Sequence, residues 1–256
     1  MTTIHTVQLA DGPAAPLVLS HALGLDHTMW QAFSQRYAGK RPVLAYDHRG
    51  HGASTASPGP YTMAQLVEDA AQVVQRWNHG PVIWLGLSLG GMVGQGLAIA
   101  HPAAVQALVL AHTTSVYPIQ AQANWAQRIQ TVQREGMAAV VDMVVQRYLT
   151  SDFQNSHPLT VGWLRQILLA TDAVGYASTC AAVAQVDWTR GLHLIQCPTL
   201  VLAGGLDMGA PVAMSEQIHQ AIAGSQLQVI AGASHLSPLE CPKKFSSLVD
   251  AFLDTL

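Results

Sequence analysis

A serine flanked by glycines is the first feature of this chain that could carry out chemistry. The pentapeptide Gly86–Gly90 follows the apolar run Val82–Leu85 and precedes a stretch of helical character. A G-x-S-x-G pattern at a strand-to-helix junction holds its serine in a sharp, strained turn, so the neighbouring residues must be small. The hydroxyl then lies at a helix N-terminus, where the dipole favours negative charge. The pattern predicts Ser88 as a nucleophile; the alternative is an ordinary helix N-cap.

A serine hydroxyl is almost un-ionised at neutral pH, so it needs a base, and the base needs an acid to orient it. Where this pentapeptide is catalytic, the triad follows the chain order Ser, acid, His. His235 follows the last strand-like run, and Asp207 follows the run before it. We therefore predict that Asp207 fixes the tautomer of His235 and stabilises its imidazolium. A helix-capping aspartate and a loop histidine are the simpler alternatives.

The oxyanion of such a reaction needs two backbone donors. One is predicted to be the amide of Leu89, directly after the nucleophile. The other is assigned to the amide of Leu23, in the loop Ser20–Gly24 that follows the strand-like run Leu17–Leu19. His21 lies in the same loop, and a structural role that ties the loop down is favoured over a direct catalytic one.

A second group of polar residues spans Asp47–Ser54. His48 and His51 lie close to Asp47 in sequence, which raises the possibility of a metal site. They lack helical spacing and any H-E-x-x-H partner, so we predict neither a metal nor an organic cofactor. Arg49 is predicted to pin the loop through backbone carbonyls.

Short apolar runs bounded by Gly, Pro and Asp must position these residues. They are near-continuous rather than alternating, as in strands buried on both faces: Leu17–Leu19, Val43–Tyr46, Val82–Leu85, Ala107–Leu110, Leu200–Ala203 and Leu227–Ile230. Helical patterns separate them: Thr62–Trp77, Leu89–Ala100, Pro211–Ala223 and Pro242–Leu253. This alternation predicts an α/β fold with a mostly parallel central sheet flanked by helices.

The alternation stops between about residues 115 and 186, where no convincing strand occurs. The segment has helical character over Ala121–Arg134, Met137–Tyr148, Leu159–Ala170 and Gly175–Ala184. We predict a helical cap inserted into a single domain, residues 1–256, and lying over the carboxyl ends of the strands.

Composition narrows the range of partners. Half of the 256 residues are hydrophobic, the formal net charge is −3, and only three lysines occur. This predicts a globular protein without a nucleic-acid stripe or a polybasic membrane patch. No secretory signal or run of about 18 apolar residues is visible, and the three cysteines form no C-x-x-C, so we expect a cytoplasmic protein. Homo-oligomerisation stays open.

Over essentially the whole chain, these motifs resemble the α/β-hydrolase superfamily, and more narrowly the 3-oxoadipate enol-lactonases of aromatic-acid catabolism. The segments that carry the likeness are Tyr46–Ser54, Gly59–Thr62, Gly86–Gly91, Trp125–Ile129, Gly175–Val183 and Gly232–Ser237. The two cap segments matter most, because many unrelated hydrolases share the catalytic motifs.

Two departures from the family pattern concern the edges of the site. The family often has Asn and Ser where this chain has His21 and Ala22, and often has Thr and Pro after the acid, where this chain has Met208–Pro211. The first departure lies in the oxyanion loop, so it affects the identity of the substrate more than the mechanism.

The resemblance implies that Ser88 opens a small unsaturated lactone through an acyl-enzyme. Such a lactone carries a free carboxylate, which in an apolar pocket calls for an arginine. Trp125 and Arg128 share a helix face at i, i+3, so we predict Arg128 as the carboxylate anchor and Trp125 as pocket wall. The alternative is a solvated Arg128 beside a core tryptophan, and Arg147 is a second candidate for the anchor.

Other functions share the same motifs. The triad would equally serve a carboxylesterase or lactonase of different substrate choice, with side perhydrolase activity of the cofactor-free haloperoxidase kind. A small-molecule receptor built on this fold would keep the pocket and lose the chemistry, but all three triad candidates are present. A scaffold role has no support, since no coiled-coil heptads or interaction tails occur.

Overall fold

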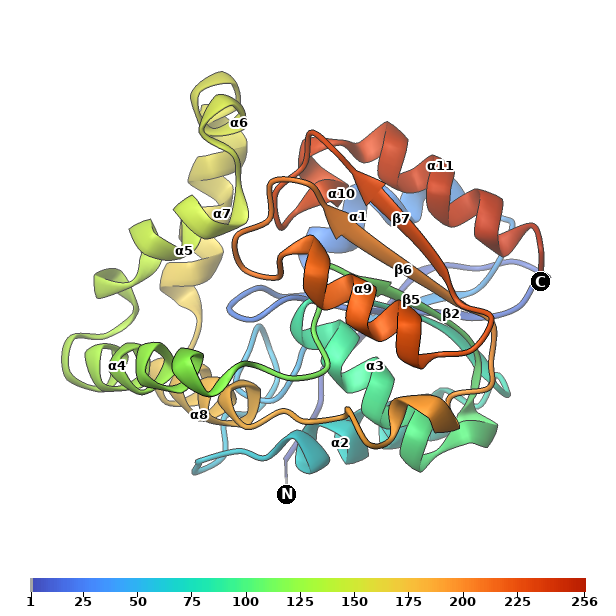
Figure 1. The fold of residues 1–256 in the computed structure, drawn as a ribbon, viewed down its shortest axis with the longest axis horizontal. Helices are drawn as coiled ribbons and strands as arrows, with labels where there is room; N and C mark the ends of the chain where they lie inside the picture. Colours follow the sequence, from blue (N-terminus) through green and yellow to red (C-terminus); the bar gives the residue numbers. More distant parts are fainter. Residues whose placement is uncertain (1) are drawn as a thin grey trace.

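The computed structural model describes residues 2–256, and its centre is a twisted seven-stranded sheet (Figure 1). The strands lie in the spatial order β1, β3, β2, β4, β5, β6, β7. Strand β1 is antiparallel to β3, and the other neighbouring pairs are parallel. The bounds are β1 Thr6–Ala10, β2 Leu17–Ser20, β3 Val43–Tyr46, β4 Val82–Leu87, β5 Val105–Ala111, β6 Thr199–Gly204 and β7 Gln226–Ile230. The mostly parallel sheet predicted from the sequence is confirmed.

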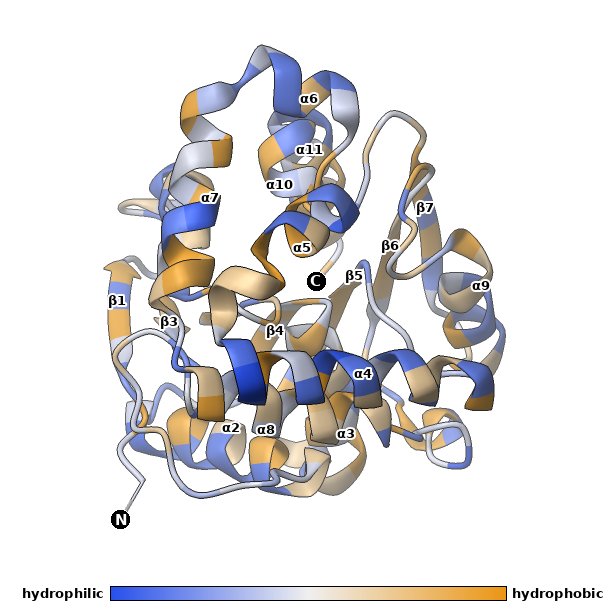
Figure 2. Ribbon diagram, turned by 90° about the vertical axis from the view of Figure 1, so that its left-hand side faces the viewer, coloured by the Kyte–Doolittle hydropathy of each residue, from blue (hydrophilic) through white to orange (hydrophobic). Residues whose placement is uncertain are grey.

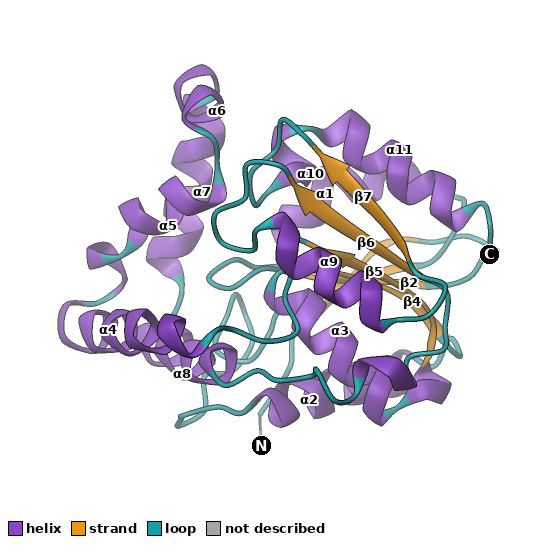
Figure 3. Ribbon diagram, viewed as in Figure 1, coloured by secondary structure: helices purple, strands orange, loops and turns teal. Residues whose placement is uncertain are grey.

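Helices cover both faces of this sheet, so successive residues of a central strand enter different halves of the core (Figure 3). On β4, Trp84 packs on one face, whereas Ile83 and Leu85 pack on the other. The first face is covered by α2 Met63–Trp77, α3 Leu89–Ala100 and α9 Val212–Ala221, and the second by α1 Gln31–Ser34, α10 Ser237–Glu240 and α11 Pro242–Leu253.

Between β5 and β6 the chain leaves the sheet and forms five helices on one side of the molecule (Figure 1). They are α4 Ile119–Glu135, α5 Val141–Tyr148, α6 Ser151–Ser156, α7 Pro158–Ala170 and α8 Ala173–Ala184. Figure 2 shows α4 as mainly hydrophilic, whereas α3 beneath the sheet is mainly hydrophobic. Where the chain leaves and rejoins the sheet, Val116 and Asp187 form an isolated antiparallel bridge. We propose that this bridge bounds the cap of a single domain.

Several elements differ from the sequence prediction. Strand β1 and the short helices within residues 27–37 were not expected, nor was α6. The predicted helix Met137–Tyr148 is a 3-10 turn, Met137–Ala139, followed by α5, which begins at Val141. Strand β1 escapes the apolar pattern because it lies at the sheet edge and most of its residues are partly or fully exposed.

No single helix among residues 2–256 is long and apolar enough to cross a membrane. The pair α7 and α8 together has the required length and composition, but the two helices meet at a bend of 95°.

Candidate active site

Ser88 occupies the turn between β4 and α3 in a strained conformation. Its φ of 56° and ψ of −111° lie outside the ordinary regions for an L-residue, while its amide donates to the Ala111 carbonyl at 2.8 Å. Thr113 donates a side-chain hydrogen bond of 2.7 Å to the Ser88 carbonyl. The turn is therefore held from the neighbouring strand β5, and Ser88 makes no side-chain capping bond to α3. Ser88 thus occupies the N-cap position of α3 without capping the helix through its side chain.

The glycines beside Ser88 are required by close backbone approach. A Cβ on Gly86 would lie 2.1 Å from the Gly90 carbonyl oxygen, and a Cβ on Gly90 would lie 2.2 Å from the Ser20 carbonyl oxygen. Strand β2 pairs with β4 so that Ser20 lies opposite Gly86. The same contacts thus bring the loop after β2, with Leu23, next to Ser88.

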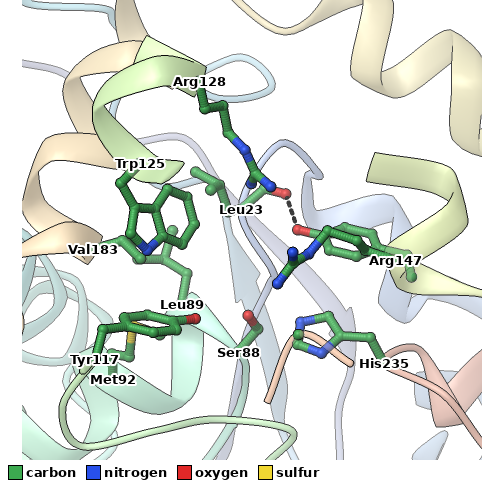
Figure 4. A pocket seen from close by; sticks show the side chains of 12 residues that line it. Leu23, Ser88, Leu89, Met92, Tyr117, Trp125, Arg128, Arg147, Val183 and His235 are labelled. Carbon is green, nitrogen blue, oxygen red and sulfur yellow. Dashed lines mark hydrogen bonds between the residues drawn. The ribbon is translucent and has the colours of Figure 1, made fainter. Parts of the chain in front are cut away.

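The structure brings His235 and Asp207 together, 28 residues apart in sequence. His235 Nδ1 lies 2.7 Å from Asp207 Oδ2, and both residues are buried. A carboxylate oxygen can only accept, so Nδ1 carries the proton and Nε2 is left with its lone pair. Figure 4 shows the imidazole beside the Ser88 hydroxyl, at the floor of a cavity that both residues line.

Two further bonds hold the loop that carries His235. The amide of Ser234 donates to the Glu240 carboxylate at 2.7 Å, and the amide of Leu236 donates to the Tyr148 carbonyl at 3.1 Å. The Tyr148 ring also stacks on the His235 imidazole, with centroids 4.9 Å apart. Helix α5 of the cap therefore takes part in orienting His235.

Asp207 accepts four hydrogen bonds in a water-poor setting. Oδ1 accepts from the amides of Gly209 and Ala210 at 2.7 and 2.9 Å, while Oδ2 accepts from His235 and from Nδ1 of His112 at 3.2 Å. Burial alone would raise the pKa of Asp207, but the charge of His235 and the bonds from both histidines outweigh it. The pKa of Asp207 therefore lies well below its usual value, and the residue stays ionised.

His112 is a residue that the sequence analysis missed. It follows β5 with φ of 51°, is completely buried, and its Nε2 lies 2.6 Å from Ser237 Oγ. Burial lowers the pKa of His112, so it is neutral. Its only signal in the sequence was its place just beyond the predicted strand Ala107–Leu110, at the edge of the sheet where Ser88 and Asp207 also lie.

The loop after β2 is fixed from the cap side. Tyr148 donates from its hydroxyl to the Leu23 carbonyl at 2.7 Å, and Thr171 donates to the Gly24 carbonyl at 2.9 Å. Both Leu23 and Leu89 line the cavity beside Ser88 (Figure 4). His21 lies in this loop too: its Nε2 accepts from the His48 amide and its Nδ1 donates to the Ala22 carbonyl. These bonds support the structural role expected of His21.

The cavity above Ser88 is small and carries two guanidinium groups. Its empty volume, including its opening to solvent, is about 360 Å³, and it is lined by Leu23, Ser88, Leu89, Met92, Tyr117, Trp125, Arg128, Arg147, Tyr148, Val183, Gly209 and His235. All three residues predicted to bind substrate, Trp125, Arg128 and Arg147, are among them. Burial raises the pKa of Tyr117, which the prediction omitted, to about 12, so its hydroxyl is neutral.

Neither arginine is neutralised by a neighbour. Within residues 2–256, the arginines that form ion pairs within 4.0 Å are Arg36, Arg49, Arg134 and Arg165, and no carboxylate reaches Arg128 or Arg147. Arg128 is half-buried, with its guanidinium carbon 4.6 Å from the Trp125 ring centroid and Nη2 3.1 Å from Met143 Sδ. Arg147 makes one long contact, 3.5 Å to the Met208 carbonyl. The cavity therefore has an excess of positive charge suited to an anion.

The expectation for Arg49 was wrong. It was predicted to bind backbone carbonyls, but it forms a two-pronged ion pair with Asp69 of α2, at 2.6 Å on each prong. The two groups are largely buried, so a carboxylate is needed to balance the guanidinium. No recognisable sequence spacing links Arg49 to Asp69.

Two sets of side chains in the described chain, residues 2–256, bring three possible metal-ligand atoms together. They are His5, His27 and Asp47, and His112, Asp207 and His235. His48 and His51 belong to neither set. In the second set both histidine Nδ1 atoms already donate to the carboxylate, which is the pattern of an acid–base site.

Comparisons with known proteins agree with this arrangement. A family model described as the alpha/beta hydrolase fold matches residues 15–242. The 3-oxoadipate enol-lactonase 2 of Acinetobacter baylyi is 35% identical over 244 residues, which are 95% of this chain and 90% of that protein.

Two solved structures have the same overall architecture. An enol-lactonase from Burkholderia xenovorans LB400 superposes with a TM-score of 0.94 at 32% identity, covering 99% of this chain and 97% of that one. A thermophilic esterase from Thermogutta terrifontis with malate bound gives a TM-score of 0.90 at 28% identity, covering 99% and 93%.

Proposed function

The chain belongs to the α/β-hydrolase fold family, and we propose that it hydrolyses 3-oxoadipate enol-lactone to 3-oxoadipate through an acyl-enzyme on Ser88. The coarser statement, that it is a carboxylic ester hydrolase acting on esters or lactones, follows from its relatives. The observation that carries the finer proposal is the cavity in which Ser88 and His235 lie under two arginines without acidic partners.

Acylation begins when Ser88 Oγ attacks the lactone carbonyl carbon and His235 Nε2 takes the hydroxyl proton. Asp207 retains the Nδ1 proton and stabilises the imidazolium. The carbonyl oxygen becomes an oxyanion held by the amides of Leu23 and Leu89. When this intermediate collapses, the ring C–O bond breaks and the enolate oxygen leaves with the proton from His235.

Deacylation repeats these steps with water. The leaving group is still tethered through the acyl chain, so it stays in the cavity while His235 removes a proton from water. The hydroxide attacks the acyl carbon, and collapse returns the proton to Ser88. The products are a new carboxylate and an enol, which tautomerises to the 3-oxo acid.

Arg128 is proposed to bind the carboxylate that the substrate carries before ring opening. Its guanidinium is half-buried, lies over Trp125 and has no acidic neighbour among the described residues, so a carboxylate would supply the missing charge. Malate, the ligand of the related esterase, is also a carboxylate. Arg147 points toward the space above Ser88 (Figure 4), where the reaction generates the second carboxylate of the product.

The test compares Arg128→Gln with Arg134→Gln, a matched change on the exposed end of the same helix. Loss of Arg128 should raise KM for the enol-lactone about tenfold or more and leave kcat/KM for p-nitrophenyl acetate within about twofold, because the neutral ester lacks the carboxylate. Arg134→Gln should change neither. An unchanged KM for the lactone in Arg128→Gln would remove Arg128 from binding.

Product-like acids give a second readout that needs no turnover. Adipate and hexanoate share a six-carbon chain and differ by one carboxylate. Adipate should inhibit ester hydrolysis competitively and about tenfold more strongly than hexanoate, and Arg147→Gln should abolish the difference. Equal inhibition of the native enzyme by both acids would contradict a site with two cations that serve two carboxylates.

A broader esterase or lactonase, with perhydrolase side activity, is the second candidate. It is favoured by the oxyanion loop, in which His21 and Ala22 replace the Asn and Ser common in enol-lactonases, and by the related esterase. Turnover of the enol-lactone, saturated lactones and p-nitrophenyl esters by one preparation separates the two. A kcat/KM for the enol-lactone below that for simple esters would favour this second candidate.

A cytoplasmic location is proposed as well. It is supported by the three cysteines, which are all free thiols. Cell fractionation of the native host checks it, and recovery outside the cytoplasmic fraction would contradict it.

A further inference from the structure

We propose that His112 is a positioning residue for the acid of the triad: it shares Asp207 Oδ2 with His235 and thereby tunes how strongly the base holds its proton. This inference rests on the proposed serine-hydrolase function, and it concerns a residue that has no part in the mechanism above.

The geometry around Asp207 Oδ2 carries the argument. This one oxygen lies 2.7 Å from Nδ1 of His235 and 3.2 Å from Nδ1 of His112, and the two rings have centroids 5.9 Å apart at 68°. Both nitrogens must donate, because an ionised carboxylate offers acceptors alone. The carboxylate is therefore shared between the base and a second, completely buried imidazole.

The other side of the His112 ring fixes its tautomer. Ser237 Oγ lies 2.6 Å from Nε2, and with the proton on Nδ1 that nitrogen can only accept from the hydroxyl. His112 is thus a neutral donor with both nitrogens satisfied. Its backbone is held as well, since its amide donates to the Leu202 carbonyl of β6 at 2.8 Å.

The topology explains why His112 can reach the acid from 95 residues away. Ala111 lies opposite Leu202 in the pairing of β5 with β6, so the ends of these strands bring residue 112 next to the loop that carries Asp207. The positive φ of 51° turns the His112 backbone away from the strand direction. This conformation is strained for a non-glycine residue, so surrounding contacts must hold it in place.

Sharing the oxygen has a predictable electrostatic consequence. A negative carboxylate stabilises the protonated form of His235, and a hydrogen bond from a second donor disperses part of that negative charge. The shared carboxylate therefore stabilises the imidazolium of His235 less than an unshared carboxylate would. Loss of the second donor should therefore move the acid limb of the pH–rate profile to higher pH.

Other titratable or charged groups face this cluster and must be counted in any pH study. From the cap and the last helices they are Tyr117, Arg128, Arg147, Tyr148 and Glu240. They are left unchanged in the variants below, so their contribution to a difference between variants is small.

The experiment compares His112→Leu with His112→Asn. Leucine fills the volume and removes the donor, whereas the Asn amide nitrogen can take the place of Nδ1 and loses only the bond to Ser237. We expect the acid limb of kcat/KM for p-nitrophenyl acetate to move up by about one pH unit in His112→Leu and to stay near the native position in His112→Asn.

A purely structural role predicts a different pattern. Both variants would lose stability in urea, and both would keep the native acid limb. That outcome, or an equal shift in both variants, would overturn the proposal. The ester readout does not depend on the identity of the natural substrate, so a failure to open the enol-lactone leaves this test intact.

If His112→Leu does not fold, NMR of the native protein gives the answer. The imidazole of His112 should be the neutral Nδ1–H tautomer throughout pH 5–8, with its Nδ1 proton hydrogen-bonded. An Nε2–H tautomer, or protonation in that range, would overturn the assignment.

Discussion

Replacing Asp207 by asparagine should disable the site in a way that its hydrogen bonds make calculable. Oδ1 accepts from two backbone amides and Oδ2 accepts from two imidazoles, so all four partners are donors. An asparagine has a single oxygen and presents an NH₂ group on its other side. In either orientation that NH₂ meets two N–H donors, and the carboxamide cannot satisfy all four.

The size of the effect follows from those unpaired groups. Two buried donors without an acceptor cost about 1–3 kcal/mol each, so the free energy of unfolding should fall by about 2–6 kcal/mol. If the NH₂ faces His235, the imidazole must reverse its tautomer and present N–H to Ser88. The loss in kcat should then be of order 10⁴, as for the equivalent change in serine-protease triads.

The assay is hydrolysis of p-nitrophenyl acetate together with urea unfolding of Asp207→Asn. Asp250→Asn is the matched control, because Asp250 also accepts from two side chains, those of Arg36 and Tyr37, but at the surface. It should cost about 1 kcal/mol or less and leave activity unchanged. Activity of Asp207→Asn within about tenfold of the native enzyme would refute the role given to Asp207.

Three further outcomes are expected. Burial and the nearby charge of His21 lower the pKa of His51 to about 3, whereas a histidine in the unfolded chain has a pKa of about 6.5. As the pH falls below about 6.5, the unfolded state therefore takes up a proton before the folded state does. The free energy of unfolding should fall by about 2 kcal/mol at pH 5 because of this one residue. Urea unfolding measures the stability lost between pH 8 and pH 5, and this loss should be about 2 kcal/mol smaller in His51→Asn than in the native protein. An equal loss in both proteins would contradict the assignment. Tyr148→Phe removes the hydroxyl that donates to the Leu23 carbonyl but keeps the ring stacked on His235. In steady-state kinetics, kcat should fall about tenfold with little change in KM. An unchanged kcat would mean that the loop after β2 is held without this hydrogen bond. The Cβ added by Gly90→Ala would lie 2.2 Å from a backbone oxygen, so this variant should lose about 3 kcal/mol or more of stability. Gly162→Ala in α7 has open space around the new Cβ and should not destabilise the protein. Thermal unfolding compares the two variants, and equal stabilities would contradict the close contact at Gly90.

The elements and residues that could be predicted from the sequence share a strong local signal. The buried strands were recognisable as short apolar runs, and helix α11 begins and ends at the residues that its proline and its apolar spacing predicted. Ser88 was recognisable because its glycines are imposed by backbone contacts that permit no Cβ. Asp207 and His235 were predicted to lie near each other because both follow strands that end at the same edge of a parallel sheet. The 2.7 Å distance between His235 Nδ1 and Asp207 Oδ2 is consistent with that prediction.

What escaped prediction depends on side-chain contacts between distant parts of the chain. His112 and Asp207 are 95 residues apart, and their places after neighbouring strands put both at one edge of the sheet without showing that their side chains meet. The ion pair of Arg49 with Asp69 on helix α2 escaped prediction for the same reason. The role of Tyr148 arises because the cap folds over the sheet edge, an arrangement that helical periodicity alone does not specify.

The central claim, that Ser88 becomes acylated, is tested most directly by acid-quenching the enzyme during turnover of a p-nitrophenyl ester and mapping the adduct by mass spectrometry. The account predicts that the peptide containing Ser88 gains the mass of the acyl group, and that Ser88→Ala shows neither adduct nor hydrolysis. An adduct on another residue, or undiminished hydrolysis by Ser88→Ala, would contradict it.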